Sequence, residues 1–140
     1  MFMMNQIKKF IPVYLLMIPV FLAIDIVWLG FIAVDLYNDQ IGFLLADEVN
    51  WIAAIIFYLL YIVGIVYFAV APGIAKKSLK YCLVSAALFG FLAYATYDLT
   101  NLATIEGWPL QVTIIDLIWG TTLTTSTAFA GWHIAKKLKV

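Results

Sequence analysis

The chain has 140 residues, of which 66% are hydrophobic and 11% charged, with a mean hydropathy of +1.04 and a net charge of zero. This composition excludes an ordinary soluble domain, which is about half apolar and about a quarter charged. We therefore expect an integral membrane protein, with the lipid bilayer as its surroundings and no nucleic-acid partner.

Four hydrophobic segments follow one another along the chain, at about residues 10–33, 51–71, 81–104 and 110–133. Each is long enough to cross a hydrocarbon core of about 30 Å, which takes about 20 helical residues. The sequence predicts an all-α fold, a four-helix transmembrane bundle that forms a single domain over residues 1–140. Pro72-Gly73 marks the expected end of the second segment.

The segments that connect the hydrophobic stretches contain residue types that indicate contact with the membrane interface. Residues 35–50 mix acidic, amide and apolar side chains, a mixture that suits a short interfacial helix between the first two spans. Trp51 and Trp108 stand at helix ends, where tryptophan commonly anchors a span at the membrane interface.

All basic residues are lysines, and they fall in three places: before the first segment, between the second and third, and after the fourth. In a chain of four spans these places share one side of the membrane. Lysine-rich connections favour the cytoplasmic side, so we expect both termini in the cytoplasm and the acidic connections outside.

Three aspartates interrupt the hydrophobic segments: Asp25, Asp98 and Asp116. An aspartate near the centre of a membrane helix costs roughly 2.5–3.5 kcal/mol on insertion scales, so such residues usually face a bundle interior or a wet cavity. Counted from the nearest lysines at 1.5 Å per residue, the three lie roughly 24, 27 and 30 Å from the cytoplasmic side. This common depth in the outer half of the membrane predicts one shared site.

Further polar and aromatic residues accompany these acids. Trp28, Asn101 and Trp119 each follow an aspartate by three positions and so share its helical face. The two tryptophans either wall an aromatic cage around a cation or fill core volume. The candidate ligand-binding residues are Asp25, Asp98, Asn101, Asp116, Trp28, Trp119, Tyr94 and Tyr58.

Three buried acids with no lysine or arginine in the spans must be neutralised by protons, by a cation or by a cationic ligand. We expect no dedicated metal site, because no Glu-x-x-His or similar ligand spacing is present. The sequence identifies neither a cofactor nor a catalytic residue. The threonine-rich run after Asp116 forms either a polar path toward the cytoplasm or a small-residue packing face, and we favour packing.

Residues 97–104, Trp108-Pro109 and the Asp116-Leu117-Ile118-Trp119-Gly120 run resemble an uncharacterised bacterial membrane family, domain of unknown function 2177. The likeness extends over essentially the whole chain in size and layout. It implies a multi-pass protein of the bacterial inner membrane and supplies no activity. It marks Asp98, Asn101, Asp116 and Trp119 as defining residues.

The leading hypothesis is a small transporter or binding protein for a proton, a cation or a small cationic or amphipathic molecule, with the three aspartates as the binding acids. One alternative is a membrane-embedded enzyme acting on a lipid or isoprenoid, with Asp98 and Asp116 as acid and base. Another is an accessory subunit of a membrane complex. Since four helices barely enclose a pathway, a homo-oligomer is also expected.

Overall fold

The computed structural model describes residues 2–140, and over this range it is built from helices and short connections. Two of the helical elements, η1 and η3, are π-helical turns, and η2 is a 3₁₀ turn. In chain order the elements are α1 (Phe2–Val27), η1 (Trp28–Ile32), α2 (Val34–Ile41), η2 (Gly42–Leu44), α3 (Trp51–Ile65), η3 (Val66–Val70), α4 (Ala71–Ala75), α5 (Leu79–Thr104) and α6 (Leu110–Lys137). The expected all-α fold is thus confirmed.

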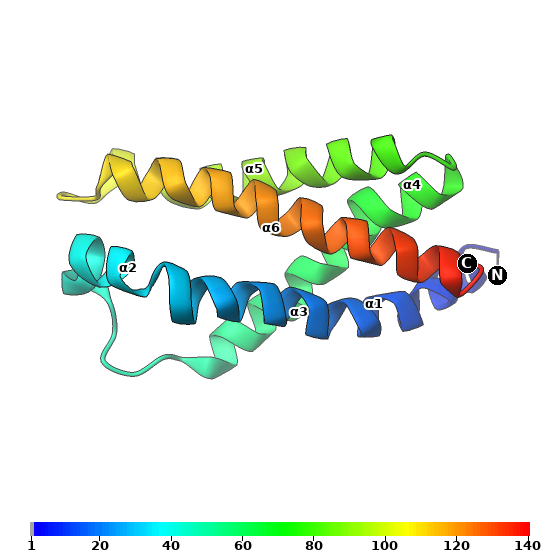
Figure 1. Ribbon diagram of the computed structural model, residues 1–140, viewed down its shortest axis with the longest axis horizontal. Helices are drawn as coiled ribbons and strands as arrows, with labels where there is room; N and C mark the ends of the chain where they lie inside the picture. The colour runs from blue at the N-terminus through cyan, green and yellow to red at the C-terminus, as the bar shows by residue number, and fades with distance from the viewer. Residues whose placement is uncertain (1) are drawn as a thin grey trace.

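Three long helices lie along one another while another crosses them. Helices α5 and α6 run antiparallel and side by side, α1 lies along α6, and α3 crosses obliquely (Figure 1). Both termini and the α4–α5 connection lie at one end, which we call the lysine end because these segments carry all the lysines (Figure 1). Helix α2 and the α5–α6 connection lie at the opposite end, the α2 end (Figure 1).

Local capping explains where the second and third segments begin. The Asn50 side chain accepts a hydrogen bond from the backbone N–H of Ala53, at 3.2 Å, and so caps α3. The Ser78 hydroxyl accepts one from the N–H of Tyr81, at 3.1 Å, and caps α5. Such caps satisfy backbone donors that a helix leaves unpaired in its first turn.

The expected stop at Pro72-Gly73 is wrong, because the second segment continues as α4 to Ala75. Pro72 stands in the first turn of α4, directly after the π-helical turn η3. The helix continues through Pro72 because the regular hydrogen-bond ladder is already shifted in η3, so the missing N–H of proline breaks little of it.

Three continuous helical stretches are long and apolar enough to cross a membrane: Met4–Ile32, Trp51–Ala75 and Leu79–Thr104. Helix α6, the expected fourth span, is not among them, although its 28 residues make it the longest helix described. Its threonine run and Asp116 lower its hydropathy. Composition therefore supports three of the four expected spans.

The apolar core occupies the part of the bundle nearer the lysine end. Its largest members come from α1, α3 and α6 and are fully buried, among them Met17, Phe21, Ile62, Ile65 and Leu123. One polar contact lies inside it, between the hydroxyls of Tyr61 and Thr124, at 2.5 Å. This packing closes the bundle between the lysine end and the aspartates.

Helices α5 and α6 approach closely because glycines stand at their crossing. A Cβ atom on Gly90 would lie 2.5 Å from the carbonyl oxygen of Gly120. A Cβ atom on Gly120 would overlap the ring of Tyr94. Small residues let helix backbones approach in this way, and here they also seat a tyrosine of the candidate site.

The short helix expected between the first two segments is present as α2, and it packs on the end of the α5–α6 pair. Ile41 forms a small buried cluster with Trp108 and Val112. Trp108 is only 7% exposed, and its indole N–H donates to the Thr113 hydroxyl at 3.1 Å. The expectation of an interfacial anchor is therefore wrong for Trp108, since α2 covers it, whereas Trp51 is 65% exposed.

Candidate functional site

Two of the three aspartates lie side by side between α5 and α6. Asp98 is fully buried, Asp116 is 6% exposed, and their carboxyl groups face each other across the helix pair. Neither oxygen of Asp98 has a hydrogen-bond partner within the described residues. Buried polar groups are nearly always paired, and the group that faces the Asp98 carboxyl is the carboxyl of Asp116, with which it can share a proton.

Tyr37 closes this pair from the α2 end. Its hydroxyl donates to Asp116 Oδ1 at 2.5 Å and accepts a hydrogen bond from Trp28 Nε1 at 3.0 Å. Burial, and secondarily the hydrogen bond to Asp116, raise the pKa of Tyr37 well above its usual value. The phenol therefore stays protonated and continues to donate to the carboxylate.

Trp28 and Trp119 stack face to face, with ring centroids 4.4 Å apart and planes 8° from parallel. This contact ties η1 to α6 beside the acids. A separation of 4.4 Å is van der Waals contact and leaves no room for a cation between the rings. Of the two alternatives for this pair, the geometry supports packing of one ring on the other.

Asp25 lies beside Trp119 and lines a groove together with both tryptophans. It is 6% exposed, and Tyr58 and Trp119 present their polar hydrogens toward it. The indole N–H of Trp119 is buried and has no hydrogen-bond partner within the described residues. The groove has a volume of about 360 Å³ and is lined by Asp25, Trp28, Leu29, Ala54, Phe57, Tyr58, Tyr94, Tyr97 and Trp119.

Tyr94 lines the groove with Asp25 and reaches α6 at Gly120, one turn from Asp116. Its ring lines the groove and covers Gly120. Asn101, half-buried one turn beyond Asp98, lies against the Tyr97 hydroxyl, and no direct contact joins it to an aspartate.

Most threonine hydroxyls of the run in α6 form hydrogen bonds with the backbone of the same helix. The hydroxyls of Thr121, Thr122 and Thr125 donate to backbone carbonyls four residues earlier. Thr127 does the same, and Thr124 pairs with Tyr61. These hydroxyls pack and pair within the protein, as the packing hypothesis expects.

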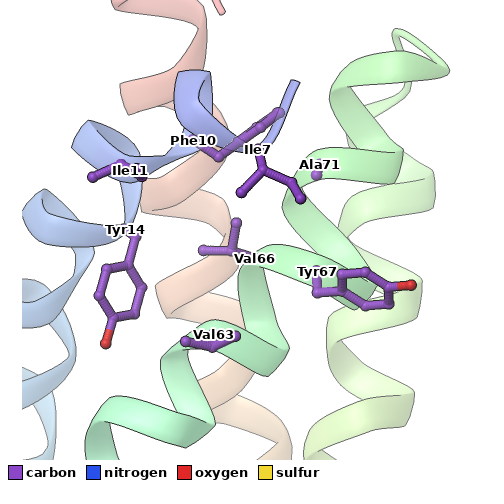
Figure 2. Close-up of a pocket in the computed structure, with 8 residues that line it drawn as sticks. All are labelled: Ile7, Phe10, Ile11, Tyr14, Val63, Val66, Tyr67 and Ala71. Atoms are coloured by element: carbon purple, nitrogen blue, oxygen red, sulfur yellow. The ribbon is translucent and has the colours of Figure 1, made fainter. Parts of the chain in front are cut away.

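A second cavity, of about 260 Å³, lies nearer the lysine end and differs in character from the acidic groove. Figure 2 shows it between α1 and the second helical stretch, with aliphatic and aromatic side chains around it. Its lining carries no charged residue: Ile7, Phe10, Ile11, Tyr14, Val63, Val66, Tyr67 and Ala71. The Tyr14 hydroxyl donates to the carbonyl of Leu59, at 3.0 Å, and so crosslinks α1 and α3.

The groove lining holds five of the eight candidate residues: Asp25, Trp28, Tyr58, Tyr94 and Trp119. Asp98 and Asp116 form a separate pair, which Tyr37 links to Trp28, and Asn101 belongs to neither group. Tyr37 is a site residue that the sequence analysis missed. Tyr37 lies 79 residues from the aspartate that it contacts, on a helix read only as interfacial. Its one sequence signal is a tyrosine on the buried side of an amphipathic segment. Within residues 2–140 no group of three or more His, Cys, Asp or Glu residues is arranged to hold a metal ion.

Comparison with protein-family models gives one match. Residues 10–133 fit the model DUF2177, described as a predicted membrane protein, which confirms the resemblance seen in the sequence. No curated protein and no solved structure matches the chain.

Proposed function

This chain belongs to the DUF2177 family of predicted membrane proteins, and on that premise we propose that it is a four-span protein of the bacterial inner membrane with both termini in the cytoplasm. Helix α6 is the fourth span in this proposal. Its 28 residues reach about 42 Å at 1.5 Å per residue, more than a bilayer core requires. Its hydropathy understates its compatibility with lipid, because most of its hydroxyls already bond within the protein.

Within this architecture the protein binds a small amphipathic cation in exchange for a proton. The observation that carries the proposal is the fully buried Asp98, whose carboxyl group faces that of Asp116 and receives no hydrogen bond from any other group within the described residues. Within the described residues no lysine or arginine reaches this pair. Two adjacent buried anions repel each other, so in the absence of a ligand the pair holds a proton.

A cation entering the groove changes this balance. Asp25 is the one charged residue in the groove lining, and the Tyr94 ring, which also lines the groove, packs on Gly120 one turn from Asp116. A positive charge bound near Asp25 lowers the electrostatic cost of ionising the carboxyl pair behind Tyr94. Cation binding and proton release are then thermodynamically linked. The bound cation favours the deprotonated carboxyl pair, and protonation of the pair weakens cation binding.

The packed core of the bundle limits the kind of transport that this conformation could support. The packed core lies between the aspartates and the lysine end, whereas the groove is bordered by the exposed side chains of Leu29, Phe57 and Tyr97. The arrangement therefore supports the binding half of an exchange cycle and argues against a continuous pore.

The exchange is tested by adding tetraphenylphosphonium, a permanently charged lipophilic cation, to the protein in weakly buffered nanodiscs of neutral lipid. The wild type is expected to release up to about one proton per bound cation. The double variant Asp98→Asn, Asp116→Asn is expected to bind the cation with no proton release. A pH-sensitive dye reports the protons, and equilibrium dialysis reports the cation.

Asp39→Asn is the matched control, because Asp39 is exposed on α2 and outside the site. It should release protons as the wild type does. Cation binding with the same proton release in the double variant would refute the carboxyl pair as the proton site. Absence of cation binding in the wild type, with product formed from an added lipid extract, would instead favour the enzyme hypothesis.

A further inference from the structure

A third cavity lies beside the acidic groove. It has a volume of about 370 Å³ and is lined by Phe57, Ala93, Tyr94 and Tyr97. Three of these residues, Phe57, Tyr94 and Tyr97, also line the groove that holds Asp25. The two cavities therefore share a wall, and we call them together the side cleft.

The side cleft opens where α3 and α5 diverge. Helix α5 packs against η3, farther along the second helical stretch, while α3 crosses away from it toward the α2 end (Figure 1). Phe57 on α3 is 51% exposed and Tyr97 on α5 is 55% exposed. In a membrane these surfaces face lipid, so the entrance of the cleft is a lateral one.

The two parts of the side cleft differ in chemistry. The outer part offers aromatic faces and an alanine, which suit an acyl chain or an aromatic ring. The inner part ends at the buried Asp25, with the unpartnered indole N–H of Trp119 beside it. No lysine or arginine lines either part.

We propose that the ligand is a lipophilic amine that enters the side cleft from the bilayer, with its cationic head at Asp25 and its tail between Phe57, Ala93 and Tyr97. This inference rests on the proposed function and names the class of ligand. A phosphate or carboxylate head group is excluded from the same place, because its charge would be buried against Asp25 with no cation to pair it.

The test uses photolabelling in nanodiscs with dodecyltrimethylammonium that carries a diazirine on its tail. Peptide mass spectrometry should find saturable labelling of the α3 and α5 residues that line the outer part of the cleft. The same tail on a carboxylate head should label lipid-facing residues without saturation. Asp25→Asn should weaken saturable labelling by the cationic probe about tenfold or more, since a buried charge pair is lost.

Two neighbouring alanines provide a matched pair of variants. Ala54 lines the groove, whereas the adjacent Ala53 is exposed on the outer surface of α3. Ala54→Leu fills the groove and should remove the saturable labelling, while Ala53→Leu should label as the wild type does. Equal labelling of both variants, or equal saturation by both head groups, would overturn the proposal.

Failure here differs from failure of the proton exchange. Saturable labelling of the cleft with no proton release would refute the exchange and leave the amine site intact. Proton release on adding tetraphenylphosphonium, with no labelling of the cleft by the amine probe, would refute lateral entry alone.

Discussion

Tyr37 is the single residue that joins α2, η1 and α6. Its hydroxyl is shared between Trp28 Nε1 and Asp116 Oδ1, and both partners are buried or half-buried. Tyr37→Phe removes both hydrogen bonds and leaves a carboxyl group and an indole N–H unpaired. We expect a loss of about 1–3 kcal/mol in stability. The loss is measured as a lower melting temperature of the variant in detergent. Amide hydrogen exchange in α2 should also be faster than in the wild type.

Tyr67→Phe is the control for this variant. Tyr67 is 70% exposed, and its hydroxyl makes no hydrogen bond within the described part of the chain. Its melting temperature should stay at the wild-type value. If both tyrosine variants behave alike, Tyr37 does not hold α2 in place.

The residues of the site could be predicted from the sequence to different degrees. Asp25, Asp98 and Asp116 stand out in the sequence because an acidic side chain in an apolar membrane helix costs free energy. Counting residues from the nearest lysines predicts that the three lie at a common depth. The Tyr37–Asp116 contact could not be found this way, since it depends on how a connecting segment folds back over the bundle. The stacking of Trp28 on Trp119 could not be predicted either. Residue spacing indicates which helical face a side chain shares, but it does not indicate how its ring is oriented.

At the scale of elements, the crossing of α5 and α6 depends on Gly120. A side chain there would overlap the Tyr94 ring, which also lines the acidic groove. Gly120→Ala should destabilise the protein by about 1–3 kcal/mol, the usual cost of overpacking a core. It should also weaken binding of tetraphenylphosphonium, because Tyr94 must move. Thermal unfolding and equilibrium dialysis measure the two effects.

Gly30→Ala makes the same chemical change in η1, where an added Cβ atom would meet nothing within 4 Å. Removing a glycine from a helical turn there is expected to be neutral or slightly stabilising. An equal loss of stability in Gly30→Ala and Gly120→Ala would mean that the overlap with Tyr94 does not account for the result, since nothing meets the added Cβ atom at Gly30.

Hydropathy and the mixed composition of residues 35–50 were enough to predict the helices, including the short α2, but not their continuations. The second segment passes Pro72 because a π-helical turn precedes the proline. The sequence also could not predict which face of each helix is buried. These helices are apolar on nearly every side, so the periodicity of hydrophobic residues does not distinguish one face from another. Trp108 shows the effect, because only the folded position of α2 reveals that it is covered.

For the whole molecule, the lysine end is the cytoplasmic end in our proposal. Single cysteines at Asp47 and Glu106, near the α2 end, should react with a membrane-impermeant maleimide added to intact cells. A cysteine at Lys139 should react only after the membrane is permeabilised. Labelling is read as a mass shift on a gel. The natural Cys82 is fully buried and should stay unlabelled throughout.

Reaction at Lys139 in intact cells would reverse the proposed orientation. Reaction at Glu106 and Lys139 from the same side would instead place α6 outside the set of spans, since these positions flank it.

Helix α6 has a further consequence, for biogenesis. It contributes more buried residues than any other described helix, and its threonine hydroxyls bond to its own backbone or to a neighbouring helix. Alone in lipid it would expose Asp116, so it gains a stable position only beside α5. In the proposed four-span architecture we therefore expect the α5–α6 hairpin to enter the bilayer as a unit. A ribosome-bound chain that ends before α6 would then leave the Asp98 face of α5 exposed to lipid and to quality-control proteases.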